Sequence, residues 1–302
     1  MALALSIALT ATGLPARAAT SAVATLSGEF RDCPMCPEMV RVPAGTFSMG
    51  DESAAAKTDE KPVHAVTVAA FAAGKYEITV GEYAAFVAAT NRETLDWCRT
   101  DRDHDGRWQD DATATWRDPG FPQTDRHPVV CVTWADANPY AAWLTQVSGK
   151  SYRLLTEPEW EYAGRSGTTA QFFWGDDPNG MCAYANGPDQ AALTQFPNWP
   201  IAACNDGQVF AAPVGSYRPN AFGLYDTAGN VWEWTQDCYT TSYAATSQSV
   251  PSDTITTCPR RALRGGSWVR GLVDLRSSQR NGLPPPQIRG GDIGFRVARS
   301  PP

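Results

Sequence analysis

The sequence predicts an α+β fold, in the form of a single irregular domain that is rich in loops. Glycine and proline account for 25 and 23 of the 302 residues, which predicts many turns and few long regular elements. A few short helix patterns occur among scattered short strand patterns, without a regular alternation of the two. No Ser/Gly-rich or Pro-rich linker divides the chain, so its length fits one large domain.

Strand patterns come first. Residues 39–50 alternate apolar and polar side chains on both sides of a Pro43-Ala44-Gly45 turn, which predicts an opening hairpin. A polar loop over residues 51–61 follows, and the alternation resumes at His64–Val68.

Helix starts are predicted by pairs of residues with capping-box spacing: Thr79 with Glu82, Thr133 with Asp136, and Thr156 with Glu159. The first helix would bury Tyr83, Phe86 and Val87, and Gly149 would end the second. After Gly164, short strands and glycine-rich loops are expected, with no further helix.

The N-terminal residues resemble a secretory leader. An apolar stretch over residues 2–11 precedes the triplet Ala16-Arg17-Ala18, which is typical of a cleavage site. We therefore expect a signal peptide over 1–19, an extension with a CxxC motif over 20–38 and the main domain over 39–299. The alternative is a disordered apolar tail. No other stretch reaches the ~20 apolar residues that span a bilayer, so we expect a periplasmic or secreted protein without a transmembrane segment in its mature chain.

Eight cysteines, an even number, favour an oxidising compartment. Each can pair with its neighbour to close a local loop: Cys33 with Cys36, Cys98 with Cys131, Cys182 with Cys204, and Cys238 with Cys258. Spacing alone does not fix this connectivity, because eight cysteines allow about 105 pairings. The CxxC motif could also be redox-active or half a zinc site, although a local bridge is the simpler interpretation.

The charge and the histidines exclude several functions. A net charge of −7 gives no basic surface for nucleic acid or anionic membranes. The three histidines, His64, His104 and His127, lie on separate segments without the spacing of a helical metal-binding pair. No Gly-x-Ser-x-Gly elbow or phosphate-binding loop is present.

Six phrases occur in an order typical of one family: His127-Pro128-Val129-Val130, Tyr152-Arg153-Leu154-Leu155-Thr156-Glu157, Phe222-Gly223-Leu224-Tyr225-Asp226, Gly229-Asn230-Val231-Trp232-Glu233-Trp234, Arg264-Gly265-Gly266-Ser267-Trp268 and Gly294-Phe295-Arg296. Together they resemble the formylglycine-generating enzyme family, also called the sulfatase-modifying-factor domain. The resemblance spans roughly residues 39–297 and implies a C-type-lectin-like topology with long loops.

The resemblance raises a question about catalysis. Oxidases of this family hold copper with two cysteines shortly after the Gly-Gly-Ser-aromatic turn. This chain has the segment Val269–Leu275 there and no cysteine up to Arg299. Copper(I) prefers thiolate ligands, which neither arginine nor leucine supplies, so we expect no copper site.

Other residues around the family's pocket persist, namely Trp232, Ser267, Arg276 and Asp292. Each also has a structural interpretation: Trp232 as a core residue, Ser267 as a turn hydroxyl, and Arg276 with Asp292 as a buried salt bridge.

The resemblance also implies two calcium-binding sites. Ca²⁺ takes six to eight oxygen ligands, and matching to the family gives a first site at Asp226, Gly229, Val231 and Glu233. A second, looser match gives a site at Asn186, Gly187, Asp206 and Gln208. The alternative for the first segment is a core in which Glu233 caps a turn.

The segment Asp101–Gly106 resembles half of an EF-hand loop. Ala112 stands where a glutamate should close such a loop, so a solvated acidic turn is favoured.

Three functions remain open. The first is an exported, calcium-stabilised family member that has lost copper-dependent cysteine oxidation and has an accessory maturation or ligand-binding role. The second is oxidation by an altered mechanism, on a cysteine-containing protein or on a small molecule, as implied by the family's pyoverdine-maturation branch. The third is a lectin-like interaction module, with which the 11 tryptophans are compatible. The sequence therefore leaves open whether the chain is an enzyme, and its protein or small-molecule ligand is unknown.

Overall fold

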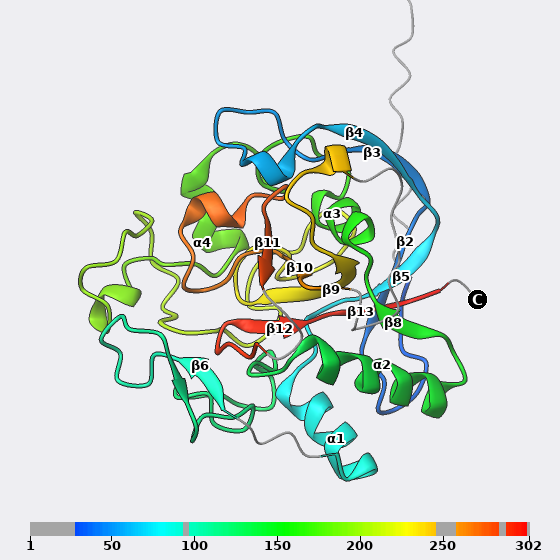
Figure 1. The fold of residues 1–302 in the computed structure, drawn as a ribbon, viewed down its shortest axis with the longest axis horizontal. Helices are drawn as coiled ribbons and strands as arrows, with labels where there is room; N and C mark the ends of the chain where they lie inside the picture. Colours follow the sequence, from blue (N-terminus) through cyan, green and yellow to red (C-terminus); the bar gives the residue numbers. More distant parts are fainter. Residues whose placement is uncertain (1–27, 93–96, 246–257, 284–287, 301–302) are drawn as a thin grey trace, which may run out of the picture.

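The computed structural model describes residues 28–92, 97–245, 258–283 and 288–300. The predicted leader over residues 1–19 lies outside them. The described strands form two larger sheets and two two-stranded sheets (Figure 1). The five-stranded sheet has the order β1 (Glu29–Phe30), β2 (Met39–Val42), β5 (Phe71–Gly74), β13 (Val297–Arg299) and β8 (Tyr152–Leu154). The four-stranded sheet has the order β11 (Arg280–Leu283), β10 (Arg261–Arg264), β9 (Trp232–Cys238) and β12 (Ile293–Phe295). The remaining pairs are β3 (Gly45–Met49) with β4 (His64–Val68), and β6 (Cys98–Thr100) with β7 (Gln109–Asp111).

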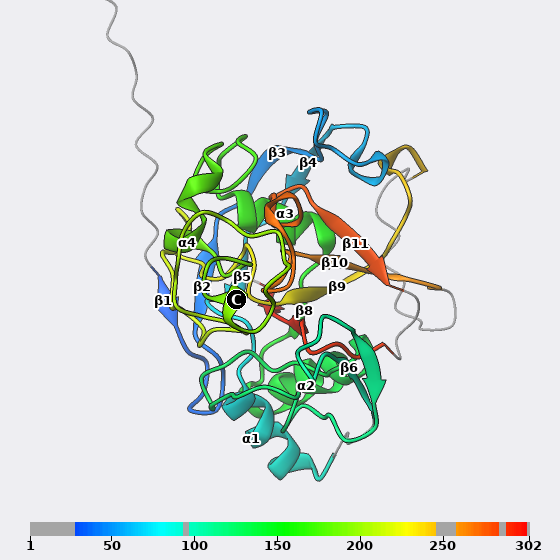
Figure 2. The same cartoon turned by 90° about the vertical axis from the view of Figure 1, so that its left-hand side faces the viewer.

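The described α-helices are α1 (Val80–Thr90), α2 (Trp134–Ser148), α3 (Glu157–Arg165) and α4 (Met181–Tyr184). Short 3-10 turns are η1 (Thr58–Glu60), η2 (Pro178–Gly180), η3 (Ala192–Thr194), η4 (Tyr243–Ala245) and η6 (Leu272–Leu275). In Figures 1 and 2, α3 lies on one side of the strands β9 and β10, and α1 and α2 lie on the other. The structure is thus an α+β domain with several small sheets and much irregular backbone.

The capping predictions for α1, α2 and α3 are confirmed. Each helix begins after a threonine whose side chain accepts a hydrogen bond from the backbone N–H of the third helical residue. The carboxylate of that third residue in turn accepts a hydrogen bond from the backbone N–H of the threonine. Gly149 ends α2 in the left-handed conformation. The four-residue helix α4 was not predicted, because one turn shows no periodicity.

The predicted opening hairpin is wrong. Strand β2 pairs antiparallel with β1 and β5, whereas β3 pairs with β4, so the two strands belong to different sheets. Both edges of β2 are therefore occupied. Since Pro43 fixes its own φ and offers no N–H, the Pro43-Ala44 step directs the chain onward to a second sheet instead of closing a ladder.

Aromatic side chains fill the core between the helices and the sheets. Tyr83 and Phe86 of α1 contact Tyr140 of α2, and Tyr140 also packs edge-on against Phe295 of β12. All four side chains are buried. This cluster fixes β12, which continues through Arg296 into β13 and so joins the two larger sheets.

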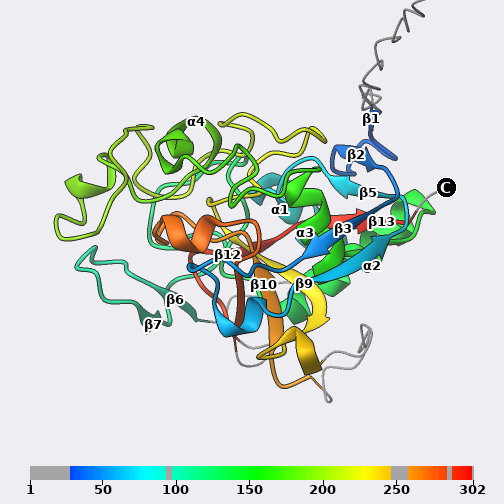
Figure 3. The same ribbon diagram turned by 90° about the horizontal axis from the view of Figure 1, so that it is seen from above.

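Long loops gather at one end of the molecule. Figure 3 shows α4 and the β6–β7 pair at the end opposite to β2, β5 and β13. The loop between β3 and β4 lies beside the orange segment that contains η6 (Figures 1 and 3). These two segments line a cavity of the described structure.

Candidate functional site

A cavity of about 720 Å³ opens between the loop before β4, the start of β9 and the segment after the Gly-Gly-Ser turn. This volume lies within the range of small-molecule sites. Its lining is mostly polar: Lys57, Thr58, Asp59, Trp232, Tyr239, Thr241, Ser242, Arg270, Asp274, Gln279, Arg280 and Asn281.

Trp232, Ser267 and Asp292, three of the predicted pocket residues, lie together. The backbone N–H of Trp232 donates to the carbonyl of Asp292 at 2.9 Å, because β9 and β12 run parallel at this point. Ser267 Oγ donates to Asp292 Oδ2 at 2.9 Å. Burial raises the pKa of the Asp292 carboxyl above its ordinary value. Asp292 can therefore accept a proton, and it lies next to Trp232 with Ser267 as its hydrogen-bond donor.

Arg276 has a different position. Its guanidinium pairs with Glu60 at 2.6 Å and with Asp51 at 2.7 Å, so the salt bridge between Arg276 and Asp292 that the sequence allowed is wrong. Sequence spacing could not show this, because the partners lie more than 200 residues earlier in the chain. Arg276 therefore holds the loop between β3 and β4 against η6 and shapes one wall of the cavity.

The Gly-Gly-Ser turn sets the course of the next segment. Gly265 and Gly266 both have positive φ, and a Cβ on Gly266 would lie 2.6 Å from the carbonyl of Asp274. From this turn, Arg270 reaches the cavity, whereas Leu275 is buried beside Met181. A guanidinium and a leucine offer no donor suited to copper(I), so the residues of this segment do not fit the family's metal.

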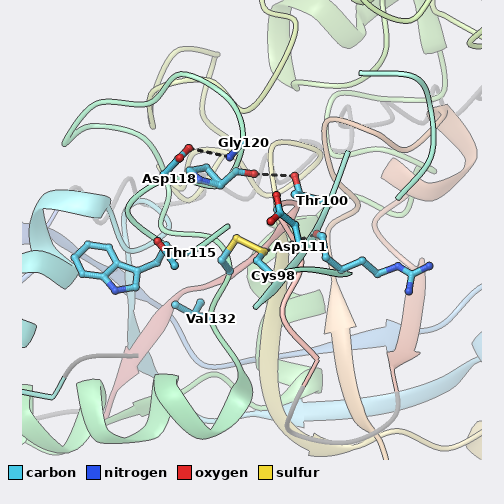
Figure 4. Close-up of a disulfide and its surroundings, with 12 residues drawn as sticks. Cys98, Thr100, Asp111, Thr115, Asp118, Gly120 and Val132 are labelled. Carbon is cyan, nitrogen blue, oxygen red and sulfur yellow. Dashed lines mark hydrogen bonds between the residues drawn. A yellow bond between two sulfur atoms is a disulfide. The ribbon is translucent and has the colours of Figure 1, made fainter. Parts of the chain in front are cut away.

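All eight cysteines of the sequence form disulfides, and the pairs are the predicted neighbours: Cys33 with Cys36, Cys98 with Cys131, Cys182 with Cys204, and Cys238 with Cys258. Figure 4 shows the Cys98–Cys131 bridge closing the insertion that contains β6 and β7. Beside it, Thr100 Oγ1 donates to the carbonyl of Pro119, and Gly120 N donates to Asp118 Oδ1. No thiol is left to act as a ligand or a nucleophile.

The first predicted calcium segment surrounds a group of buried acids. Asp226 Oδ2 accepts the N–H of Gly215, while Oδ1 has no hydrogen-bond partner among the described residues. Glu233 is held by the guanidinium of Arg296 at 2.8 Å and by the indole of Trp160. The carbonyl groups of Gly229 and Val231 lie along the same segment, at the start of β9.

Glu77 belongs to the same acidic group, although the sequence did not indicate it. Its carboxylate accepts the side-chain amide of Asn230 at 2.7 Å and the N–H of Val231 at 3.2 Å. Burial raises the pKa of Asp226 to about 6, and burial together with the carboxylates of Asp226 and Glu233 holds the pKa of Glu77 well above its usual range. Three buried carboxylates thus share one ion-paired guanidinium, that of Arg296, and the charge of Arg126 also acts on Asp226. A bound cation would relieve the remaining excess of negative charge.

Two members of the second predicted calcium set, Asp206 and Gln208, are joined by a hydrogen bond. Asp206 Oδ2 accepts the Tyr217 hydroxyl at 2.7 Å, and Oδ1 accepts the N–H of Gln208 at 2.7 Å. Burial and neighbouring Asp189 raise the pKa of Asp206 to about 6. Asn186 contacts the same loop, because its side-chain amide donates to the carbonyl of Phe210, two residues after Gln208, at 2.9 Å.

Asn186 also contacts the first calcium segment. Its side-chain amide donates to Asn230 Oδ1 at 3.2 Å, and its carbonyl accepts the N–H of Asn230 at 2.9 Å. Gly187, next in the chain, lies so close to Leu275 and Met181 that a Cβ there would meet both.

One described group of three metal-ligating residue types, Cys182, Asp189 and Cys204, brings its ligand atoms within 4.8 Å of one another. Two of these atoms are the sulfurs of a disulfide, which are not thiolate ligands.

The EF-hand-like segment forms an acidic turn that closes on itself. Both oxygens of Asp101 accept backbone N–H groups, from Asp105 at 3.0 Å and from Gly106 at 2.7 Å. Asp111 instead pairs with Arg102. These contacts favour the solvated turn over a calcium loop.

Behind the cavity lies a buried ion network. Arg280 lines the cavity and pairs with both oxygens of Glu157 at 2.7 Å, at the start of α3. Asp237 accepts the N–H of Glu157, and burial, together with the Glu157 and Glu159 carboxylates, raises its pKa to about 7.

Among the described residues, no helix is both long and apolar enough to cross a membrane.

Comparisons with known proteins agree with this architecture. Residues 25–301 match the family described as Sulfatase-modifying factor enzyme 1-like domain. The chain is 36% identical over 296 residues to the formylglycine-generating enzyme of Streptomyces coelicolor, covering 86% of this chain and 88% of the relative. It is 32% identical over 300 residues to the inactive C-alpha-formylglycine-generating enzyme 2 of Mus musculus, covering 87% and 86%. The structure of PvdO from Pseudomonas aeruginosa matches with a TM-score of 0.76 and 37% identity over 91% of this chain and 98% of that one.

Proposed function

Because the chain belongs to the formylglycine-generating enzyme family, also called the sulfatase-modifying-factor family, we propose that it uses the family's scaffold without the family's copper chemistry. In this proposal the cavity beside Trp232 binds a ligand, in an accessory maturation or ligand-binding role, and the protein does not oxidise cysteine with copper. Its relatives include both formylglycine-generating enzymes and an inactive one, so family membership alone does not decide activity.

The observation that carries this proposal is the state of the cysteines. All eight lie in disulfides, and the segment that should supply copper ligands places Arg270 in the cavity and Leu275 in the core. A positive guanidinium repels a cation at that point and cannot act as a soft ligand.

The test is an oxidation assay. The full-length exported protein is incubated with Cu(I), oxygen and a cysteine-containing sulfatase peptide, and aldehyde is measured by mass spectrometry. We expect no aldehyde above the level without protein, while the Streptomyces coelicolor enzyme converts the peptide under the same conditions. Stoichiometric aldehyde formation would refute the proposal.

A second candidate function is oxidation of a small molecule by a mechanism that uses no thiol of the protein. The Ser267–Asp292 pair favours it, since a buried carboxyl with a raised pKa can accept or deliver a proton. Oxygen consumption is measured after a reduced small molecule is added. Consumption that Asp292→Asn abolishes would indicate turnover and not binding alone.

We further propose that calcium stabilises the fold at Asp226, Gly229, Val231 and Glu233, with Glu77 supporting the site. The unpaired Asp226 Oδ1 and the excess of buried negative charge support this site. The set of Asn186, Gly187, Asp206 and Gln208 is a weaker candidate, because its members contact different partners.

Calcium removal tests this part of the proposal. Protein purified without chelator should contain at least one equivalent of calcium by mass spectrometry, and a chelator should lower Tm. Free calcium at a hundredfold excess over Kd should restore about 2–3 kcal/mol of stability. Asp226→Ala, which removes the ligand oxygens, should lose this response, whereas Asp103→Ala, at an exposed site, should keep it. Calcium-free protein with an unchanged Tm would contradict the site.

We also propose that the protein works in the periplasm or outside the cell, since four disulfides persist best in an oxidising compartment. Fractionation of cells that express the full chain tests this directly, and recovery of reduced protein from the cytoplasm would oppose it.

A further inference from the structure

Most cations that line the cavity are neutralised by a bonded carboxylate. Lys57 Nζ lies 2.9 Å from Asp274 Oδ1. Arg280 is paired with Glu157 at 2.7 Å. Neither cation needs a ligand to balance its charge.

Arg270 is the exception within the described lining. Its guanidinium makes no hydrogen bond to a described residue, and its ion pair with Asp292 spans 3.8 Å, which exceeds hydrogen-bond distance. The Asp292 oxygen concerned, Oδ2, already accepts the hydroxyl of Ser267. With its side chain 46% exposed, Arg270 presents free donors to the cavity.

The cavity also offers an aromatic wall. Trp232 is buried and lines the cavity, and its indole Nε1–H has no acceptor among the described residues. A buried donor without a partner is uncommon in folded proteins, and here it stands beside the cavity that would hold a ligand.

We propose that Arg270 binds the carboxylate of a small organic acid whose apolar or aromatic body lies along Trp232. This inference rests on the proposed ligand-binding function and adds the chemical class of the ligand. A planar carboxylate matches the guanidinium fork with two parallel hydrogen bonds. A single negative charge is favoured over a doubly charged phosphate, because the Asp59 and Asp274 carboxylates also line the cavity.

The experiment uses three probes on the intact protein: benzoate, the neutral analogue benzamide, and inorganic phosphate. Each is titrated at constant ionic strength, and binding is followed by the indole N–H resonance that disappears in Trp232→Phe. Arg270→Gln removes the charge. Arg107→Gln is the matched control, because Arg107 is 85% exposed and lies the same 3.8 Å from a carboxylate, that of Asp105.

Benzoate should shift the Trp232 resonance saturably and bind at least about tenfold more tightly than benzamide. Arg270→Gln should weaken benzoate by about tenfold and leave benzamide unchanged, and Arg107→Gln should match the native protein. The proposal is overturned if benzoate does not bind saturably, if it binds no better than benzamide, or if Arg270→Gln has no effect. Tighter binding of phosphate would overturn the carboxylate class.

These outcomes can be separated from failure of the proposed function. Copper-dependent aldehyde formation would refute the latter whether or not benzoate binds. Failure of the benzoate titration with no aldehyde formation would leave the loss of copper chemistry intact and remove only the ligand class.

Discussion

Several charged side chains of this protein are buried. Arg264, Arg276, Arg280 and Arg296 are almost fully buried, and each pairs with a carboxylate. A charge left unpaired in such surroundings is costly, so carboxylates without a guanidinium retain their protons to higher pH. Asp237 is one of these.

The stability of the fold should therefore depend on Asp237. The pKa of Asp237 is about 7 in the folded protein and about 4 in the unfolded chain. At a pH between about 4 and about 7, Asp237 therefore binds a proton when the protein folds. The free energy of unfolding should fall as pH rises from about 4 to about 7, by on the order of 4 kcal/mol from this group. Asp237→Asn can still accept the N–H of Glu157 and should flatten the dependence. Urea denaturation from pH 4 to pH 8 measures it, with Asp103→Asn as the control. Unchanged curves for both variants would show that Asp237 is ionised in the native state.

At the scale of elements, loops are secured by buried ion pairs between distant segments. Arg276 joins η6 to the loop before β4 through Glu60 and Asp51, and Lys57 crosses to Asp274. The two walls of the cavity therefore depend on each other.

Arg276→Met should destabilise the protein by about 3–5 kcal/mol, because it leaves the Glu60 carboxylate buried without its partner. Arg31→Met, which breaks an exposed pair with Glu38, should cost less than about 1 kcal/mol. Denaturant midpoints provide the comparison, and limited proteolysis should cut residues 51–63 faster only in Arg276→Met. Similar costs for the two variants would argue against the buried anchor.

Local signals explain which elements the sequence predicted. Thr79, Thr133 and Thr156 each form their cap with a residue three positions away, so a short window contains the whole motif. One of the two partners of β2 is β5, about 30 residues on, and the partners of Arg276 lie farther away in the sequence. Pairing at such distances depends on the assembled core, which explains the wrong hairpin and the wrong salt bridge.

For the whole molecule, the fold class was predictable because the family's motifs are spread along the chain, and the disulfide pairs were predictable because they are local. Each insertion returns close to the point where it leaves the scaffold, so neighbouring cysteines pair, as Cys98 and Cys131 do. The cavity was only partly predictable. Trp232 belongs to one of the family's motifs, but Lys57 and Arg280 line the same cavity from segments that no spacing connects.

With all eight cysteines in disulfides, this family member has no thiol with which to hold copper or oxidise cysteine. Mass spectrometry after alkylation of the denatured, unreduced protein tests for such a thiol. We expect no alkylated cysteine and a mass eight hydrogens lower than that of the fully reduced chain, since four disulfides are formed. Stoichiometric alkylation of two cysteines would contradict it and would reveal a thiol pair available for the family's chemistry.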